Sequence, residues 1–491
     1  MQDVVPFAVV VAVAALALLV AVASSRVSAL VNLPAPAIFL VAASIIADVF
    51  PDLGSLSIVS DQQIVTVALV LILFDGGMHI GLSRFRTAAG GVVWLGVAGT
   101  FLTAAPLAVA AHYLLGFDWT AALLIGTALA PTDPAVVFSV LGRREIAGRT
   151  GTLLEGESGA NDPVGIALMI SLLAATGAVG ASGSSVWTAV GHGAVEFVLQ
   201  MVIGAVLGVA GGYALRWVIQ HLPMPNEALY SVRTVAFALL VYGVVTVAHG
   251  SGFLAVFVAG ILVGDTRAPY KREIERFASA VASLAEIVAF TVLGLSIPIS
   301  EAFGGERAWI GIALAALLIL VIRPLFVGLV LAPIRLRRGE RAFVLAAGLK
   351  GAVPILLGTY VLAEGVAGAQ HIYAVIFVVV LVSVVLQGGL VPLLARWWGV
   401  PMRVVEPEPW ALGMRFRDEP QGLHRYVVSS GSSADGTSIG DLPLAEDVWI
   451  SMVSRGGRLV QVRGTTTLQA GDEVLVLAED DAGVDALFGR A

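Results

Sequence analysis

The sequence contains no cysteine, which excludes disulfide bonds, thiolate metal sites and a cysteine nucleophile. Charge is also scarce: charged residues make up 13% of the 491 residues, against roughly 25% in soluble globular proteins. There is no basic run and the formal net charge is −7, so nucleic acid is not an expected partner. Hydrophobic residues make up 58% and the mean hydropathy is +0.92, which excludes a water-soluble enzyme for most of the length.

Apolar runs long enough to cross a bilayer as helices recur along the first 398 residues. A hydrocarbon core of about 30 Å needs roughly 20 apolar residues in a helix. The weakest boundary lies at His249–Gly252, where two runs could form one broken helix. About 13 candidate spans are predicted: 4–24, 33–50, 61–78, 90–115, 119–140, 152–176, 186–218, 231–248, 252–264, 277–297, 308–331, 342–363 and 371–395.

The basic residues between these runs indicate an orientation. Alternate loops carry 16 of them, and the opposite set of loops carries only Arg307. Basic loops favour the cytoplasmic side. We therefore expect a multi-pass protein of the cytoplasmic membrane, with the N-terminus outside and the C-terminal region in the cytoplasm. The first run begins almost at Met1 without a basic segment before it, so we interpret it as a span and not as a cleaved signal.

The charge balance changes near residue 400. Up to that point there are 20 basic and 21 acidic residues, and beyond it there are 8 basic and 14 acidic ones. Trp397 and Trp398 form an interfacial aromatic pair at the end of the last apolar run. We predict a transmembrane domain over 1–398, a proline-rich linker over 399–422 and a small acidic domain over 423–491.

One face of the predicted span 152–176 carries polar oxygens. Ser158 and Asp162 are four residues apart, and Ser158 and Asn161 are three apart, so the three share a helix face, with Glu157 at its edge. An ionisable side chain at mid-membrane costs about 2.5–3.5 kcal/mol even on the lenient insertion scale. Hard oxygens with one carboxylate suit exchange of Na⁺, K⁺ or H⁺, and no base lies within one turn of Asp162.

Two other spans are predicted to be broken. Pro131 and Pro134 bracket Thr132 and Asp133, and the second break runs from Gly348 to Pro354 around Lys350. Paired interrupted helices in the two halves of a chain indicate a midplane site built from inverted repeats. The predicted fold is therefore an all-α polytopic membrane protein with inverted repeats and two broken helices, followed by a small α+β cytoplasmic domain.

Structural roles compete with functional ones for most of these charges. Asp133 and Lys350 can serve only to neutralise helix-end dipoles. Glu157 and Arg323 can form a buried ion pair that fixes helix packing without touching substrate. Glu286 is compatible with a pathway residue or a helix contact. For Asp162 the functional interpretation is favoured.

The membrane region resembles a known family. Thr132-Asp133-Pro134, Gly156-Glu157-Ser158 with Asn161-Asp162, Arg323 and Gly348-Leu349-Lys350-Gly351-Ala352 occur in the order typical of the monovalent cation:proton antiporter-1 family. Members often carry Arg where this chain has Lys350, which keeps the charge but not the fork geometry. The resemblance implies that Thr132, Asp133, Ser158, Asn161 and Asp162 bind the alkali cation or the proton, and that Glu157 pairs with Arg323.

The C-terminal region resembles the TrkA-C half of the regulator-of-K⁺-conductance module. Short apolar strands alternate with glycine turns such as Gly456-Gly457 and Gly471-Asp472. No G-x-G-x-x-G occurs between 399 and 424, so binding of NAD or ATP is not expected. Relatives of this module include cyclic-di-AMP binders, and both a ligand-sensing role and a passive assembly role stay open. No other cofactor is expected.

Together the two resemblances imply a K⁺/H⁺ antiporter of the cell-volume-regulation type, regulated or assembled by its tail. They further imply electroneutral exchange, because Asn161 stands where electrogenic relatives carry a second Asp, an elevator-like movement, and a homodimer formed through both domains. Na⁺/H⁺ exchange is the alternative within the family. A K⁺ channel subunit would need a carbonyl filter such as T-V-G-Y-G, which is absent. No motif specific for an organic solute supports a symporter.

Overall fold

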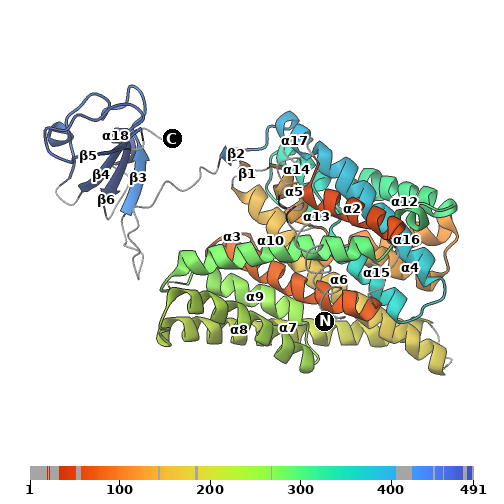
Figure 1. Ribbon diagram of the computed structural model, residues 1–491. Helices are drawn as coiled ribbons and strands as arrows, with labels where there is room; N and C mark the ends of the chain where they lie inside the picture. Colours follow the sequence, from red (N-terminus) through yellow and green to blue (C-terminus); the bar gives the residue numbers. More distant parts are fainter. Residues whose placement is uncertain are drawn as a thin grey trace, which may run out of the picture. The chain divides into compact units, whose positions relative to one another are not determined.

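The computed structural model describes two compact units, residues 1–409 and 410–491 (Figure 1). The described residues are Leu19, Val22, 33–50, 57–141, 144–146, 148–182, 186–266, 268–404, 423–445, 448–456, 458–478 and 484–488.

The described residues in the first half of unit 1 form helices and one short strand. Polar residues cap several of these helices through the backbone N–H three positions on, as Ser57, Asp118 and Asn226 do. The elements are α2 (Ala35–Val49), α3 (Ile58–Leu115), α4 (Trp119–Ala128), α5 (Pro134–Leu141), β1 (Arg144–Ile146), α6 (Arg149–Ser182), α7 (Val186–His221) and α8 (Glu227–Val247).

The second half of unit 1 contains two π-helical segments, η2 and η3. Pro324 lies inside η2, where its missing N–H removes one α-helical hydrogen bond. The elements are α9 (Gly252–Gly264), α10 (Lys271–Leu295), α11 (Ile299–Ala302), α12 (Glu306–Leu317), η2 (Leu318–Val327), α13 (Gly328–Leu331), α14 (Arg338–Ala346), α15 (Ala352–Ala363), α16 (Ala369–Val382), η3 (Ser383–Gln387), α17 (Gly388–Trp397) and β2 (Met402–Val404).

Helix α3 consists of two helices joined at Gly81. This residue has φ 65° and ψ 163°, a conformation open to glycine, and the Asp265 carboxylate accepts a hydrogen bond from the Ser83 N–H beside it. The two segments correspond to the predicted spans 61–78 and 90–115. The sequence breaks the helix where a membrane crossing has to reverse.

The spans predicted from 33–50 onward are all found as helices or as pairs of half-helices. The described residues include 7 helices long and apolar enough to cross a membrane, α3 among them, and four shorter apolar ones. The first predicted span, 4–24, lies outside the described residues apart from Leu19 and Val22. At His249, φ is 58° and α8 and α9 are separate helices in contact, which resolves the boundary left open above.

The two broken helices meet inside unit 1. The first consists of α4 and α5, interrupted at 129–133, and the second of α14 and α15, interrupted at 347–351. Their breaks are joined directly, because the Asp133 N–H donates to the Leu349 carbonyl at 2.8 Å. Helices α7, α8 and α9 lie on one side of the bundle, and α12, α16 and α17 lie on the other (Figure 1).

A short antiparallel ladder joins residues 402–404 to residues 144–146. Strand β1 lies between α5 and α6, and it pairs with β2 so that Arg144 faces Val404 and Ile146 faces Met402. The chain that leaves α17 is therefore hydrogen-bonded to the segment between the half-helix that begins beside Asp133 and the helix that carries Asp162.

Unit 2 is built on an antiparallel sheet. Its strands are β3 (Leu423–Val427), β4 (Trp449–Arg455), β5 (Arg458–Val460) and β6 (Glu473–Leu477), in the order β3-β6-β4-β5, with the 3₁₀ turn η4 (Ile439–Asp441) and α18 (Asp485–Phe488). Apolar residues such as Val453, Val474 and Phe488 form a core of its own. The predicted α+β fold of this domain is confirmed, and residues 405–422 of the predicted linker lie outside the described residues.

Candidate functional site

Asp162 lies on α6, and one of its carboxylate oxygens makes no hydrogen bond with a described residue. The residue is 6% exposed, and its Oδ2 accepts a long hydrogen bond of 3.4 Å from the Ser158 hydroxyl one turn earlier. Its Oδ1 is buried and has no hydrogen-bond partner among the described residues. A buried carboxylate oxygen without a partner is costly unless a proton or a cation satisfies it. Asp162 therefore has an oxygen available to bind a proton or a cation.

Thr132 and Asn161 hold each other across the first helix break. The Asn161 amide nitrogen donates to the Thr132 hydroxyl at 2.8 Å, and the Asn161 amide oxygen accepts from the Thr132 N–H at 3.3 Å. This reciprocal pair fixes the unwound segment beside Asp162. The arrangement gives Asn161 a positioning role, because both ends of its amide face Thr132.

Asp133 serves the ends of two half-helices. Its Oδ1 accepts from the Ala135 N–H at 2.9 Å, and its carboxylate also interacts with the N–H groups of Val136 and Ala352. These groups lie in the first turns of α5 and α15, where a negative charge is favourable. The crossing is close: a Cβ on Gly351 would collide with the Asp133 carboxylate, so only glycine fits there.

Lys350 binds the carbonyl groups at the C-terminal end of α4. Its Nζ donates to the carbonyl oxygens of Ala130 at 3.0 Å and Pro131 at 2.9 Å, which follow α4 and lack intrahelical partners. The side chain is 1% exposed and lies within electrostatic range of Asp162 without a hydrogen bond to it. Asp133 and Lys350 therefore stabilise the two broken helices from opposite ends.

Glu157 and Arg323 form a buried salt bridge between α6 and η2. Arg323 Nη2 lies 2.9 Å from Glu157 Oε1, and the two side chains are 3% and 4% exposed, respectively. Arg323 also donates to the carbonyls of Leu345 at 2.9 Å and Val344 at 3.2 Å near the end of α14. The guanidinium is therefore engaged by Glu157 and by the second broken helix, and Asp162 is left without a guanidinium partner.

Ser383 and Gln387 were not found from the sequence, whereas Glu286 was already a candidate. Ser383 accepts from the Lys350 N–H at 3.0 Å and donates to Gln387 at 2.8 Å, so η3 supports the second break. Glu286 of α10, left open above, has a buried Oε1 without a hydrogen-bond partner among the described residues and interacts electrostatically with Asp133. The only sequence signal for Ser383 and Gln387 is a polar pair four residues apart in an apolar span.

Comparison with known proteins gives a consistent result for both units. Residues 11–397 match the family described as sodium/hydrogen exchanger, transmembrane, and residues 423–488 match the TrkA-C domain. The chain is 31% identical over 493 residues to a K(+)/H(+) antiporter NhaP2 of Shewanella sp. strain MR-4, which covers 98% of this chain and 83% of the relative.

The chain is also similar to two further antiporters in sequence and to one solved antiporter structure. Identity is 33% to a K(+)/H(+) antiporter NhaP of Alkalimonas amylolytica (94% and 79% covered) and 28% to a Na(+)/H(+) antiporter NhaH of Halobacillus dabanensis (69% and 84% covered). The fold matches the sodium proton antiporter MjNhaP1 of Methanocaldococcus jannaschii with a TM-score of 0.64 at 22% identity, covering 78% of this chain and 99% of that one.

Proposed function

The chain belongs to the sodium/hydrogen exchanger family, and from this premise we propose that it exchanges K⁺ for H⁺ across the cytoplasmic membrane. Membership of this family makes it a multi-pass transporter and not an enzyme. K⁺ is preferred over Na⁺ because the relatives that match most of its length, TrkA-C domain included, are named K⁺/H⁺ antiporters. Na⁺/H⁺ exchange is the second candidate, supported by the name of the relative from Halobacillus dabanensis.

The exchange is carried by Asp162. Its unpartnered Oδ1 can take either a proton or an alkali cation, and not both at once. Because an empty carboxylate is unfavourable in the membrane interior, the helices that carry it cross mainly when it is occupied. Competition for one group then couples the two fluxes.

The remaining ligands in this proposal are oxygens of Ser158 and Thr132. Ser158 supplies a hydroxyl, and Thr132 supplies its hydroxyl or carbonyl from the unwound segment. Asp133 lies close enough to interact electrostatically with Asp162, but its Oδ1 is engaged by the first turn of α5. Asn161 is neutral and positions Thr132, which leaves a single exchangeable charge and supports electroneutral one-for-one exchange.

The movement that exposes Asp162 in turn to each side is an elevator-like shift of the broken-helix pair. The reciprocal contacts between the two breaks, through Asp133, Leu349 and Lys350, favour their moving together as one body. The N-terminus lies outside and the TrkA-C domain in the cytoplasm, with a homodimer formed through both units. The TrkA-C domain regulates or assembles the dimer, and cyclic-di-AMP is its first candidate ligand.

Replacing Asp162 tests this function. In proteoliposomes with an imposed pH gradient, Asp162→Asn should abolish K⁺-driven proton flux, because the amide can neither bind a proton in this range nor neutralise a cation. Parallel assays with K⁺, Na⁺, Rb⁺ and Li⁺ should show K⁺ and Rb⁺ preferred. Undiminished flux in the variant contradicts the role of Asp162, and a clear preference for Na⁺ and Li⁺ selects the second candidate. Titration calorimetry of the full chain with nucleotides tests the ligand of its tail.

A further inference from the structure

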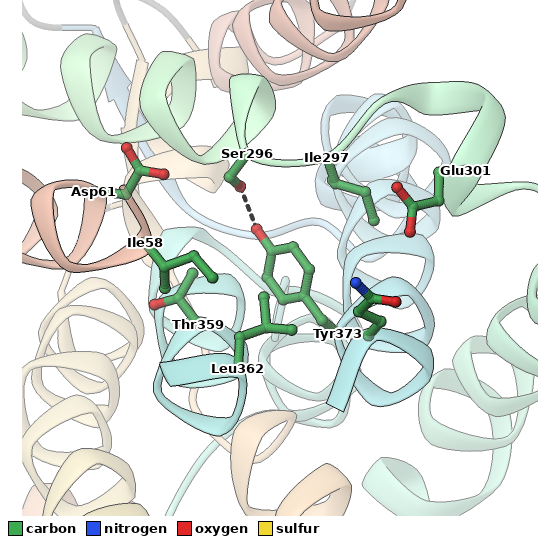
Figure 2. Close-up of a pocket in the computed structure, with 9 residues that line it drawn as sticks. Ile58, Asp61, Ser296, Ile297, Glu301, Thr359, Leu362 and Tyr373 are labelled. Atoms are coloured by element: carbon green, nitrogen blue, oxygen red, sulfur yellow. Dashed lines mark hydrogen bonds between the residues drawn. The ribbon is translucent and has the colours of Figure 1, made fainter. Parts of the chain in front are cut away.

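A polar cavity lies away from Asp162, at the end of unit 1 where α3 begins and α10 ends (Figure 2). Its volume is about 160 Å³. Thr359 lines the cavity and lies eight residues after Gly351, the glycine packed against Asp133. Eight helical residues span about 12 Å, so the cavity is separate from the crossing of the two broken helices. The polar residues that line it are Asp61, Ser296, Glu301, Thr359, Gln370 and Tyr373.

Asp61 presents an unsatisfied carboxylate to this cavity. The residue is 4% exposed, and its carboxylate makes no hydrogen bond or salt bridge with any described residue. It is not required to cap α3, because the Ser57 side chain accepts from the Ser60 N–H at 3.1 Å. A buried carboxylate of this kind needs a counter-charge or a proton.

The other lining groups are hard oxygen donors. The hydroxyl of Thr359 donates to the Leu356 carbonyl at 2.7 Å, so its lone pairs remain available. The Ser296 hydroxyl bonds to the hydroxyl of Tyr373 across the cavity, as Figure 2 shows. Oxygen donors of this type suit alkali and alkaline-earth cations.

Charge and volume select the class of ion. Glu301 is partly exposed and its Oε1 lies 3.6 Å from Arg307 Nη1, which leaves Asp61 as the one buried and unpaired carboxylate among the lining residues. Divalent Ca²⁺ sites usually gather several carboxylates. The cavity has room for one cation and a few waters, since a water takes about 30 Å³. We propose that Asp61, with Thr359 and Ser296, binds a partly hydrated monovalent alkali cation at a second site.

The two walls of this site belong to different parts of the bundle. Asp61, Ser296 and Glu301 come from α3, α10 and α11, whereas Thr359 comes from α15, which continues the second broken helix. A shift of the broken helices would change the distance between these walls. A role for this site in transport therefore rests on the proposed function. If the broken helices move as proposed, the site would load cation from the side of the membrane on which α3 begins.

Anomalous diffraction with Tl⁺, a monovalent cation of K⁺ size, locates the site in crystals of the full chain. We expect Tl⁺ density in contact with the Asp61 carboxylate in wild type and in Asp162→Asn, and its loss in Asp61→Asn. Asp48→Asn is the matched control, since Asp48 lies at the same end, bonds to the Ser300 hydroxyl at 2.6 Å and does not line the cavity. It should keep the density.

The outcomes separate this inference from the exchange at Asp162. Absence of Tl⁺ density at Asp61 in wild type overturns the second site, whatever is seen at Asp162. Density at Asp61 without density at Asp162 supports the second site and counts against the proposed function. Displacement of Tl⁺ by Mg²⁺ or Ca²⁺, but not by excess K⁺, also contradicts a monovalent site.

Flux measured from each side gives a second test. With Asp61→Asn, the Rb⁺ concentration for half-maximal exchange should rise several-fold on the side where α3 begins and stay unchanged on the other. Preserved Rb⁺ dependence on that other side shows that the variant is folded. An equal rise on both sides, or none, is evidence against a loading site, whereas Asp48→Asn should behave as wild type.

Discussion

At the scale of single residues, the buried charges divide into those that are satisfied and those that are not. Arg323, Glu157, Asp133 and Lys350 all have partners among backbone carbonyls, N–H groups or each other. Among the described residues, Asp162 Oδ1 and Glu286 Oε1 have no hydrogen-bond partner, and the buried Asp61 carboxylate makes no hydrogen bond or salt bridge. Satisfied charges hold the helices together, and the unsatisfied ones are where a mobile ion can bind.

The Glu157–Arg323 bridge should matter for stability more than any exposed pair. Removing one partner leaves a buried charge uncompensated, so Glu157→Gln should lower the free energy of unfolding by about 3–5 kcal/mol, measured by denaturant titration in detergent. Combining it with Arg323→Met should recover much of that loss. The control is Glu275→Gln, whose pair with Lys271 at 3.5 Å is partly exposed and should change stability by less than about 1 kcal/mol. Equal losses in the two single variants contradict this interpretation.

The residues also show what sequence reasoning can reach. The face of Ser158, Asn161 and Asp162 follows from helical spacing, and the structure places all three on α6. The role of Asn161 does not follow from it, because its partner Thr132 is 29 residues away and only tertiary contact reveals the pair. Asp61 gave no signal, since an acidic residue in the first turn of a helix is ordinary. The open oxygen of Asp162 likewise depends on where Arg323 points.

At the scale of elements, the crossing of the two broken helices leaves no room for a side chain at Gly351. Gly351→Ala should therefore push α15 away from Asp133 and reduce exchange strongly, measured as K⁺-driven proton flux per inserted protein. The matched control is Gly90→Ala in α3, where nothing lies within 4 Å of the added Cβ. It should be tolerated, with a gain of up to about 1 kcal/mol in helix stability. Full activity in Gly351→Ala would show that the crossing can open without cost.

A salt bridge between Arg455 and Asp472 stabilises the sheet of the TrkA-C domain. Burial alone would raise the pKa of Asp472, but hydrogen bonds from Arg455, at 2.8 Å and 2.7 Å, and from the Gln469 N–H hold the pKa below its ordinary value. A lowered pKa in the folded state means that the stabilisation is present above the ordinary value near 4 and is lost as the pH falls further.

Acid unfolding of residues 423–491 tests the contribution of this salt bridge to stability. The midpoint of thermal unfolding should fall on acidification below about pH 4 in the wild-type domain. In Asp472→Asn the domain should be less stable at pH 7 and should show a smaller change below pH 4. A variant with the pH profile of wild type would assign the acid sensitivity to other carboxylates.

At the scale of the whole molecule, each unit has a core of its own. All the residues around Asp162 belong to unit 1. A chain that ends at residue 404 should therefore still exchange cations for protons in proteoliposomes, and should lose whatever response the TrkA-C domain confers. Correct membrane insertion without any exchange would show that unit 2 is needed for the transport cycle itself.

The overall architecture was readable from the sequence because lipid imposes simple rules. Hydrophobic length gives the spans, and prolines and glycines give the breaks at 129–133 and 347–351. The π-helical turns, the exact residue at which the chain reverses between the spans 61–78 and 90–115, and the pairing of β1 with β2 were not predicted. They arise from contacts between segments far apart in the chain, which local periodicity does not record.

The ladder between β1 and β2 determines which part of unit 1 would bear a force applied to the chain after residue 404. Residues 402–404 are bonded to 144–146, so tension on the chain at residue 405 is borne first by the turn between α5 and α6, ahead of α17. That turn joins the half-helix that begins beside Asp133 to the helix that carries Asp162. Tension on the chain that leaves residue 404 would therefore act on the half-helix beside Asp133 and on the helix that carries Asp162.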